Sequence, residues 1–589
     1  MNISLFPNAT EVEQFAAWEL ERYLSLALEQ DVPYTFVLTR ANDLPGPEGM
    51  RIRITEDTVE LSGTADGKGR GLLYAVYEFL ERYLGCCFGA YCHPDVPGGE
   101  VIPTHDNLHL PREEYVKSCA DLPYRTAIVQ FDFWAGNADR GLTLSFIDWL
   151  AKNRYNRILT WVSCYEQLIA LGFEEELKKR GIYMSVGHHQ AISTWLPPYG
   201  SHRFPTAYAL EHPEFYRLLP DGSRYQPKDP KDYHGQLCLC CRSEACIETV
   251  ANNVLSWLED HPLVDTIAFW PHDGMDAQCC CEACAPYSKT ENYLYFENQL
   301  ALRIRAKRPE VKVDVLVYQD LWECPENVTL SDGIIIDLAT WAKTGMRPCG
   351  KLDGSALVGS SFEKVLMDYH KKGCHGVYYD YYMGNFANRQ KLMPAADEMQ
   401  SIFRNMVQLG LDGSGTQMEC FNHWNNLLNF YCFARTAYDT GLSLEDNLSR
   451  FVRLFGEGST EMAEILRHYE KTLDGQVPIR ETGNFFIMEI DRESIYTLFD
   501  KALSHTVGPA CRNNIRMMRM AFRYSHLATV DAAEDRGLHP TTFEDPTGEL
   551  AYMATHFDSY YANHTGYGIA LPVVQRTDAP APNHWYEFD

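Results

Sequence analysis

Residues 266–274 read TIAFWPHDG, and this stretch shows the pattern that decides the fold. The apolar run TIAFW is typical of a buried strand, Pro271 ends it, and His272 and Asp273 follow directly. Seven other short apolar runs between about residues 124 and 422 also end in polar or aromatic residues and lead into helical stretches. Strands that alternate with helices predict a parallel sheet, and eight of them predict an α/β protein with a closed (β/α)8 TIM barrel.

The expected barrel occupies residues 120–440, and two other regions flank it. Residues 1–115 predict a small α/β domain, and 441–589 predict a mostly helical region because amphipathic stretches follow one another there. An insertion at 190–247 separates the third and fourth strands, and insertions at the carboxyl ends of barrel strands usually shape a substrate cleft. We expect the strands near 125–134, 156–163, 182–188, 265–271, 312–319, 334–340, 376–382 and 413–420.

Composition narrows the classes of partner. The chain has 589 residues and a net charge of −28, which disfavours binding to nucleic acid and to anionic membrane surfaces. It contains no run of ~18 apolar residues that would predict a transmembrane helix. The N-terminal sequence MNISLFPNATEVEQF lacks the basic and apolar segments of a secretory signal. Together with 19 cysteines, this predicts reduced thiols and a cytoplasmic location.

The strand ends supply carboxylates, histidines and aromatic side chains, which are the groups that cleavage of glycosidic bonds uses. Asp273 is the first candidate for a proton donor or for a group that orients the substrate, although an Asp before a Gly also caps turns. Its partner is Glu419 or Asp380; alternatively, Glu419 forms a salt bridge with an arginine of the barrel. The candidate sugar-binding residues at the same face are His188, His189, His272, Tyr318, Asp337, Trp341, Tyr381 and Trp424.

Three ambiguities remain in this set. Alternate residues of a strand face opposite ways, so the sequence does not decide whether Asp380 or its tyrosine neighbours face the barrel axis. Each tryptophan could equally belong to the core. The adjacent histidines His188 and His189 could bind sugar hydroxyls or a metal, but the spacing of a helical two-histidine metal site is absent.

The cysteines suggest a second kind of site. The run QCCCEAC contains Cys279, Cys281 and Cys284, and its C-x-x-C element can place two thiolates on one cation. The interpretations are a structural zinc ion, buried free thiols or a disulfide, and we expect no cofactor that catalysis requires. Further thiols that could complete a site of four lie about 40 residues earlier, a looser spacing than in most zinc ribbons: Cys238, Cys240, Cys241 and Cys246.

Several segments resemble known families. ATEVEQFAAWELERYL and GRGLLYAVYEFLERYLG resemble the domain that precedes the barrel in glycoside hydrolase family 20 hexosaminidases and family 67 α-glucuronidases. The barrel resembles the domain of unknown function 4838 (DUF4838), grouped around glycoside hydrolase family 163. The pieces that carry this second resemblance are VGHHQ, QLCL, PHDGMDAQCCCEAC and ENYLYFENQLALRIRAKRPEVKVDVLVYQD. The resemblance spans about residues 10–460 and implies endo-acting cleavage at N-acetylglucosamine in N-glycans, with retention through the acetamide of the substrate.

The sequence departs from family 20 at one place. Those enzymes carry an adjacent Asp-Glu pair after the fourth strand, whereas this chain has His272, Asp273 and Gly274. One carboxylate cannot both orient an acetamide and protonate the leaving oxygen, so the second must come from another strand, or the mechanism differs.

We therefore expect a β-N-acetylglucosaminidase-like glycosidase whose partner is an oligosaccharide or glycan. The alternatives are a carbohydrate-binding barrel without catalysis, and a glycosidase for another sugar such as a uronic acid. The latter would need an Arg or Lys at the rim to hold the sugar carboxylate.

Overall fold

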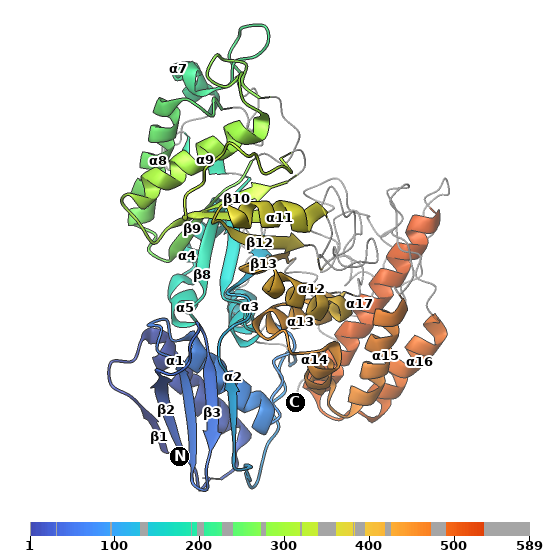
Figure 1. Ribbon diagram of the computed structural model, residues 1–589. Coiled ribbons are helices and arrows are strands. Elements are labelled where there is room, and N and C mark those ends of the chain that lie inside the picture. Colours follow the sequence, from blue (N-terminus) through green and yellow to red (C-terminus); the bar gives the residue numbers. More distant parts are fainter. Residues whose placement is uncertain are drawn as a thin grey trace.

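The protein consists of an N-terminal sheet domain, a central barrel and a group of C-terminal helices (Figure 1). In this computed structural model the described residues are 2–30, 32–92, 94, 97–129, 140–189, 191–196, 205–226, 239–271, 278–318, 321–339, 361–380, 382, 395–418, 424, 426–472 and 491–534.

The N-terminal domain is a five-stranded sheet in the order β1-β2-β4-β3-β5, with two helices packed on it. The strands β3 and β4 pair antiparallel and form a hairpin. A capping box at Thr10 and Glu13 begins α1. The elements are β1 (Asn2–Leu5), α1 (Glu11–Ala27), β2 (Thr35–Ala41), β3 (Met50–Ile54), β4 (Thr58–Thr64), α2 (Arg70–Tyr83) and β5 (Glu113–Lys117).

Eight parallel strands close into a barrel in the order β10-β11-β12-β13-β6-β7-β8-β9, which confirms the predicted TIM barrel. Each of the eight expected apolar runs forms one strand. The strands are β6 (Tyr124–Val129), β7 (Arg157–Trp161), β8 (Tyr183–His188), β9 (Val264–Phe269), β10 (Lys312–Val317), β11 (Ile334–Ala339), β12 (His375–Asp380) and β13 (Gly413–Gln417).

Both faces of these strands are buried, which explains their nearly continuous apolar sequences. One set of alternate residues fills the inside of the barrel, with Ile128, Leu159 and Leu316 among them. The other set, with Val313 and Ile336 among them, packs against the surrounding helices. We call the end where the strands begin the amino end of the barrel and the opposite end the carboxyl end.

Helices surround the barrel, and the chain between β8 and β9 forms additional structure beyond its carboxyl end (Figure 1). The helices of the barrel and the insertion are α3 (Arg140–Lys152), α4 (Val162–Ala170), α5 (Glu174–Lys179), α6 (Ala191–Trp195), α7 (Pro205–Glu211), η1 (Pro213–Phe215), α8 (Glu244–Glu259), α9 (Lys289–Arg305), α11 (Ser361–Lys371), α12 (Ala396–Gln408) and α13 (Leu427–Tyr438). The C-terminal helices are α14 (Leu444–Phe451), η6 (Val452–Gly458), α15 (Ser459–Thr472), α16 (Arg492–His505) and α17 (Pro509–Glu534).

Buried ion pairs join the N-terminal domain to the amino end of the barrel. Glu48 precedes β3 and is 1% exposed, and its carboxylate accepts hydrogen bonds from Arg70, Arg125 and Asn156. Burial opposes the charge of Glu48, but Arg125 and Arg70 outweigh it and lower its pKa to about 2. The N-terminal domain is therefore fixed to the barrel by the buried Glu48 carboxylate and its two arginine partners.

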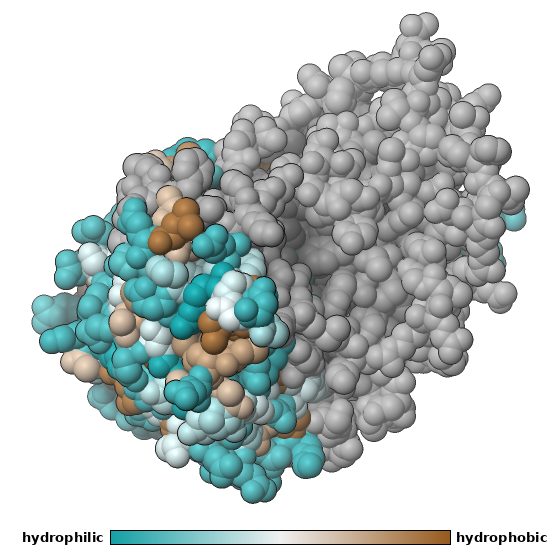
Figure 2. Space-filling view, turned by 90° about the horizontal axis from the view of Figure 1, so that it is seen from above, coloured by the Kyte–Doolittle hydropathy of each residue, from teal (hydrophilic) through white to brown (hydrophobic). Residues whose placement is uncertain are grey.

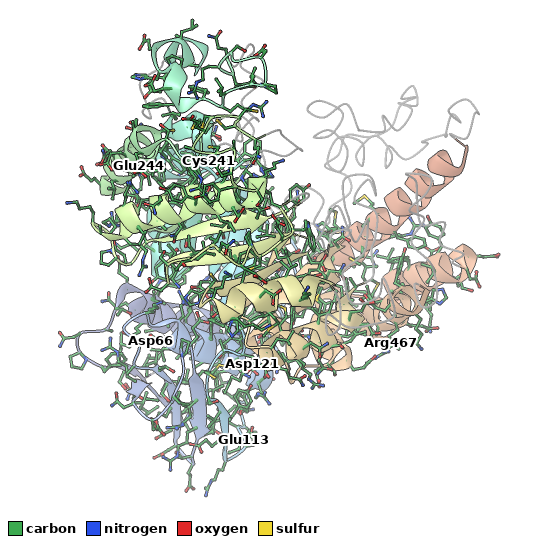
Figure 3. The ribbon with its side chains drawn as sticks, turned by 45° about the horizontal axis from the view of Figure 1, so that its top comes forward. Asp66, Glu113, Asp121, Cys241, Glu244 and Arg467 are labelled. Carbon is green, nitrogen blue, oxygen red and sulfur yellow. The ribbon has the colours of Figure 1, made fainter. Side chains whose placement is uncertain are left out.

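A second cluster of charges extends this junction to the C-terminal helices. On α2, Glu81 accepts hydrogen bonds from Arg435 of α13, and Glu78 accepts from Arg450 of α14 at 2.9 Å. Arg154 contacts both carboxylates, at 3.3 and 3.4 Å. The three parts of the chain thus share buried charges. Figure 3 shows the N-terminal domain, with Asp66 and Glu113, on the opposite side of the barrel from Cys241 and Glu244 of the insertion.

The described helices include none with the length and hydrophobicity needed to cross a membrane. Viewed from above, the coloured part of the surface carries mostly hydrophilic side chains with small hydrophobic areas between them (Figure 2).

Candidate active site

The carboxyl end of the barrel contains part of the predicted site within the described residues. His188, His189 and Tyr318 lie there together with Trp270, which the sequence placed at the end of the fourth strand. Five predicted site residues lie outside the described residues: His272, Asp273, Trp341, Tyr381 and Glu419.

His188 faces the inside of the barrel because the backbone turns at the end of β8. Strict alternation along β8 would send His188 outward with Met184 and Val186, which pack against the helices. Gly187 and His188 instead have φ angles of 141° and 61°. A positive φ is costly for a residue with a side chain, and such strain is concentrated at functional sites.

The ring of His188 is enclosed by aromatic neighbours. It lies 4.5 Å from the Trp270 ring, 4.5 Å from the His189 ring and 5.8 Å from the Trp161 ring, measured between centroids. Burial and the adjacent His189 hold the pKa of His188 well below its usual value, so its neutral form is favoured. A neutral imidazole can donate one hydrogen bond and accept another, as recognition of a sugar hydroxyl requires.

His189 fixes the start of the segment that carries Asp273. Its Nδ1 atom makes a hydrogen bond with the carbonyl oxygen of Pro271. Its ring also lies 6.3 Å from the Tyr318 ring and 5.7 Å from the Trp270 ring. His189 therefore connects the end of β8 to the ends of β9 and β10.

Trp270, Tyr318 and Tyr379 form an aromatic floor inside the carboxyl end of the barrel. Trp270 and Tyr379 are stacked, with centroids 6.0 Å apart and an interplanar angle of 29°. The hydroxyl of Tyr379 donates to Oε1 of Gln417 at 3.2 Å. This combination of flat apolar faces and polar edges is suited to a sugar ring, and the sequence did not single out Tyr379 or Gln417.

Two carboxyl groups lie beneath this floor, inside the barrel. The indole nitrogen of Trp270 donates to Oδ1 of Asp314 at 2.6 Å. Burial raises the pKa of Asp314 to about 7, against the opposing effects of the Trp270 hydrogen bond and the Arg157 charge. The sequence analysis missed Asp314, although an Asp in the middle of the apolar strand KVDVLV is an available signal.

The structure places Asp337 differently from the expectation. Asp337 was expected at the rim, but it lies within β11, is 2% exposed and faces the barrel interior. Burial first, and then the charge of Asp314, raise its pKa well above the usual value. No described residue makes a hydrogen bond with its Oδ1 atom. Asp337 is thus an interior group beneath the floor with a raised pKa, and its position does not support a direct contact with a sugar at the rim.

Asp380, at the end of β12, and Trp424 lie on the outer side of the barrel strands. Asp380 is fully buried and accepts a hydrogen bond from Tyr378 at 3.1 Å. Tyr378 belongs to the layer between the strands and the helices, so Asp380 shares the outer face of β12, whereas Tyr379 faces the barrel interior. Trp424 is 2% exposed and packs in the same outer layer, which agrees with the core position that the sequence left open for it.

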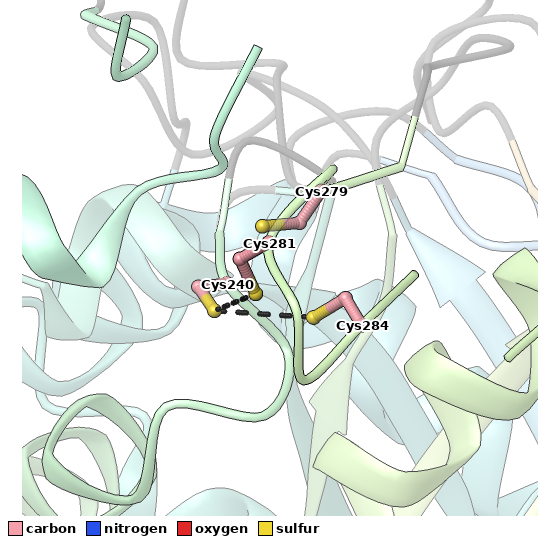
Figure 4. Close-up of side chains that lie close together, drawn as sticks. All are labelled: Cys240, Cys279, Cys281 and Cys284. Atoms are coloured by element: carbon pink, nitrogen blue, oxygen red, sulfur yellow. Dashed lines mark hydrogen bonds between the residues drawn. The ribbon is translucent and has the colours of Figure 1, made fainter. Parts of the chain in front are cut away.

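The cysteine-rich turn after β9 lies near this site in the sequence and forms a cluster of its own. The Sγ atoms of Cys279, Cys281 and Cys284 lie together with that of Cys240, all within 4.8 Å of one another (Figure 4). Of the earlier cysteines that the sequence offered, Cys241 and Cys246 belong to the apolar core, and Cys238 lies outside the described residues. These four thiols are the set that could hold a metal ion.

A polar cavity of about 350 Å³ lies at the other end of the barrel. The first residues of the strands line it, with Tyr124, Arg157 and Lys312 among them, together with Arg70 of the N-terminal domain. Because TIM-barrel active sites lie at the carboxyl end, this cavity belongs to the domain junction and not to the candidate active site.

Comparisons with solved structures match this architecture to glycoside hydrolases. A GH138 enzyme targeting pectin rhamnogalacturonan II has a TM-score of 0.56 and 11% identity, and the match covers 90% of this chain and 70% of that one. The Clostridium perfringens family 89 enzyme, solved in complex with its substrate GlcNAc-alpha-1,4-galactose, has a TM-score of 0.56 and 12% identity, with 90% and 63% covered. At these identities the likeness is one of fold.

The same C. perfringens family 89 glycoside hydrolase in complex with 2-acetamido-1,2-dideoxynojirimycin has a TM-score of 0.55 and 12% identity, with 94% of this chain and 65% of that chain covered. No curated protein matches the sequence. The family model for the domain of unknown function DUF4838 matches residues 96–471, which is more than half of the chain and includes the whole barrel. The protein belongs to the DUF4838 family.

Proposed function

We propose that the protein is a glycoside hydrolase that cleaves a glycan at an N-acetylhexosamine residue. The observation that carries this proposal is the floor at the carboxyl end of the barrel, where His188, His189, Trp270, Tyr318 and Tyr379 gather beside the start of the Asp273 segment. Flat rings can stack on the apolar face of a pyranose, and neutral imidazole and phenol groups can bind its hydroxyls.

The position of Asp273 in the chain supports its role as the acid. Asp273 lies two residues after Pro271. The carbonyl oxygen of Pro271 is held by the hydrogen bond with His189. In a barrel glycosidase, a carboxyl group at this point can protonate the leaving oxygen or orient the acetamide of the substrate. We assign Asp273 one of these two tasks.

Glu419 is the better partner of the two that the sequence offered. Met418, the residue between β13 and Glu419, donates its backbone N–H to the carbonyl oxygen of Ile128 at 2.8 Å, so Glu419 follows a fixed part of the backbone. Asp380, by contrast, shares the outer face of β12 with Tyr378. His272, Trp341 and Tyr381 remain proposed sugar-binding residues on the strength of the sequence.

The choice of an N-acetylated sugar rests on two supports. The C. perfringens family 89 structure holds a substrate with N-acetylglucosamine, and its fold covers most of this chain. In substrate-assisted cleavage the acetamide acts as the nucleophile, so the protein does not have to provide a nucleophilic carboxylate at the required spacing of ~5–5.5 Å from the acid. The mechanism still needs one carboxylate to orient the acetamide and one to protonate the leaving oxygen, so Glu419 would supply the second beside Asp273.

A substrate panel tests the proposal. Purified protein is incubated with 4-nitrophenyl N-acetyl-α- and N-acetyl-β-D-glucosaminide, the corresponding glucoside and glucuronide, and a released N-glycan. We expect cleavage of an N-acetylglucosaminide or of the N-glycan, and inhibition by an N-acetylglucosamine-derived thiazoline, which mimics the intermediate formed by the acetamide.

Each alternative has its own outcome in this panel. Cleavage of the glucuronide alone would indicate a uronic-acid glycosidase. Saturable binding of the N-glycan without cleavage would indicate a carbohydrate-binding barrel and would contradict the proposal.

A further inference from the structure

Four cysteine thiols from two separate parts of the chain meet beyond the carboxyl end of the barrel. Cys240 belongs to the insertion after β8, and Cys279, Cys281 and Cys284 belong to the segment between β9 and α9. Figure 4 shows the side chains of both segments converging on one point. Three of the four are buried, with Cys240 5%, Cys279 3% and Cys284 0% exposed.

The spacing of the sulfur atoms fits a single tetrahedral ion. The Sγ atom of Cys240 lies 3.6 Å from that of Cys281 and 3.9 Å from that of Cys284. Four sulfurs at ~2.3 Å from a central zinc ion lie about 3.8 Å from one another in a regular tetrahedron. A disulfide would require a sulfur–sulfur distance of about 2.05 Å, so the arrangement differs from that of a bonded pair.

Backbone and side-chain groups around the cluster hold the ligands in place. The N–H group of Leu218 donates to Sγ of Cys279 at 3.2 Å, as amides around metal-bound thiolates do. Asn292 of α9 donates to the carbonyl oxygen of Cys284 at 3.0 Å and accepts from Arg242 at 2.7 Å. The two ligand-bearing segments are therefore already connected through a shared layer of hydrogen bonds.

From this geometry we propose that Cys240, Cys279, Cys281 and Cys284 bind one structural zinc ion that joins the insertion to the segment after β9. All four positions are protein ligands, which is the closed arrangement of a structural and not a catalytic zinc site. The site goes beyond the glycosidase function, since no open position remains for a water molecule or a substrate.

The ion would also hold Cys279, which follows the segment that carries Asp273. His189 fixes the start of this segment at Pro271, and the first zinc ligand, Cys279, follows Asp273 by six residues. Loss of the ion should therefore release this segment at one end. This consequence rests on the proposed function, whereas binding of the ion does not.

The test compares single Cys→Ser variants within the same cysteine-rich segments. Cys240→Ser and Cys281→Ser each remove one ligand. Cys280→Ser is the matched control, because Cys280 lies in the same run of three cysteines but is exposed and outside the cluster. Protein purified without chelator is measured for zinc by elemental analysis and for thermal unfolding temperature.

We expect about one zinc per wild-type chain and per Cys280→Ser chain, and less than about a third in Cys240→Ser and Cys281→Ser, with a lower unfolding temperature for both. Zinc below about a tenth of an equivalent in the wild type, a disulfide detected by mass spectrometry, iron in place of zinc, or equal zinc in all variants would each overturn the proposal. If the ligand variants do not fold, titration of the wild type with a mercurial thiol reagent decides, because it should release one zinc ion as the thiolates react.

Turnover provides a separate readout for the effect on Asp273. Removal of zinc with a chelator should lower turnover, and added zinc should restore it. If the wild type contains zinc but its turnover does not change when the zinc is removed, the link to the Asp273 segment is overturned. The metal site itself would still stand. If the wild type cleaves no substrate, zinc content and thermal unfolding still decide whether the site exists.

Discussion

The pKa values of buried carboxyl groups are shifted in opposite directions toward the two ends of the barrel. At the amino end, Glu48 is buried among Arg70, Arg125 and Asn156, and its pKa is lowered to about 2. Toward the carboxyl end, Asp314 and Asp337 are equally buried, and burial raises the pKa of both. At the amino end the carboxylate is paired with arginines, whereas the two carboxyl groups beneath the aromatic floor have raised pKa values.

This difference indicates that the buried charges contribute to stability at the amino end and to chemistry at the carboxyl end. A buried carboxylate that is fully paired joins domains, and its pairing is strongly destabilising to break. Carboxyl groups with raised pKa values are destabilising features, and such features are concentrated at functional sites. A positive φ does not distinguish the two ends, because Glu48 and Arg154 at the amino end have φ angles of 58° and 73°, close to the 61° of His188. The comparison therefore supports a catalytic carboxyl end, independently of the likeness to glycoside hydrolases.

The largest effect on stability is expected for Glu48→Gln. Removal of this charge leaves Arg70 and Arg125 buried without their partner, which should cost about 3–5 kcal/mol of unfolding free energy at neutral pH. The folded-state pKa of about 2 lies below the ordinary value of 4.5, so the contribution of Glu48 is present above pH 4.5 and is lost as the pH falls toward 2. The difference between the variant and the wild type, measured by denaturant unfolding, should shrink over that range.

Glu56→Gln is the matched control for this prediction. Glu56 pairs with Arg112 in the same domain, but both side chains are exposed, at 79% and 66%. Its loss should cost less than about 1 kcal/mol. Equal effects of the two substitutions would remove the contrast between the ends of the barrel.

A smaller effect of the opposite sign is expected for Asp314→Asn. The pKa of Asp314 is about 7 in the folded chain and 3.8 ordinarily, so the folded state binds more protons between these values. The unfolding free energy of the wild type should therefore fall as the pH rises through this range. Asn cannot ionise but keeps an acceptor for the Trp270 indole, so the variant should lack this decline.

Thermal unfolding between pH 4 and pH 8 measures the difference. The two proteins should be most similar near pH 4, and the advantage of the variant should grow up to about pH 7 and then stay constant. Asp332→Asn serves as the control, because the Asp332 side chain is 86% exposed and should not change the pH dependence. Parallel curves for Asp314→Asn and the wild type would show that Asp314 is not held protonated.

The fold could be predicted from the sequence because its signal is local and repeated. Runs such as TIAFW and KVDVLV are buried on both faces, so each shows its strand without reference to the rest of the chain. The interior position of Asp314 was also visible in principle, since an acidic residue in such a run must face something buried.

The site was less predictable because it depends on contacts across the chain. Cys240 joins the other cysteines only through the packing of an insertion about 40 residues away, so the sequence could not choose it over Cys241. His188 points inward only because the backbone turns at Gly187, which alternation alone does not show. The sequence also left open whether Asp380 faces outward, because alternation does not show which set of residues faces the barrel axis.

The most direct test of the account compares Asp273→Asn with Asp380→Asn on the substrate that the wild type cleaves. We predict that Asp273→Asn lowers turnover by ~10²-fold or more, the scale of one acid–base contribution, with no change in thermal unfolding. Asp380→Asn should keep most of the turnover, because Asp380 shares the outer face of β12 with Tyr378. Turnover above about a tenth of the wild-type value in Asp273→Asn, together with a ~10²-fold loss in Asp380→Asn, would contradict the assignment of the acid to the segment after β9.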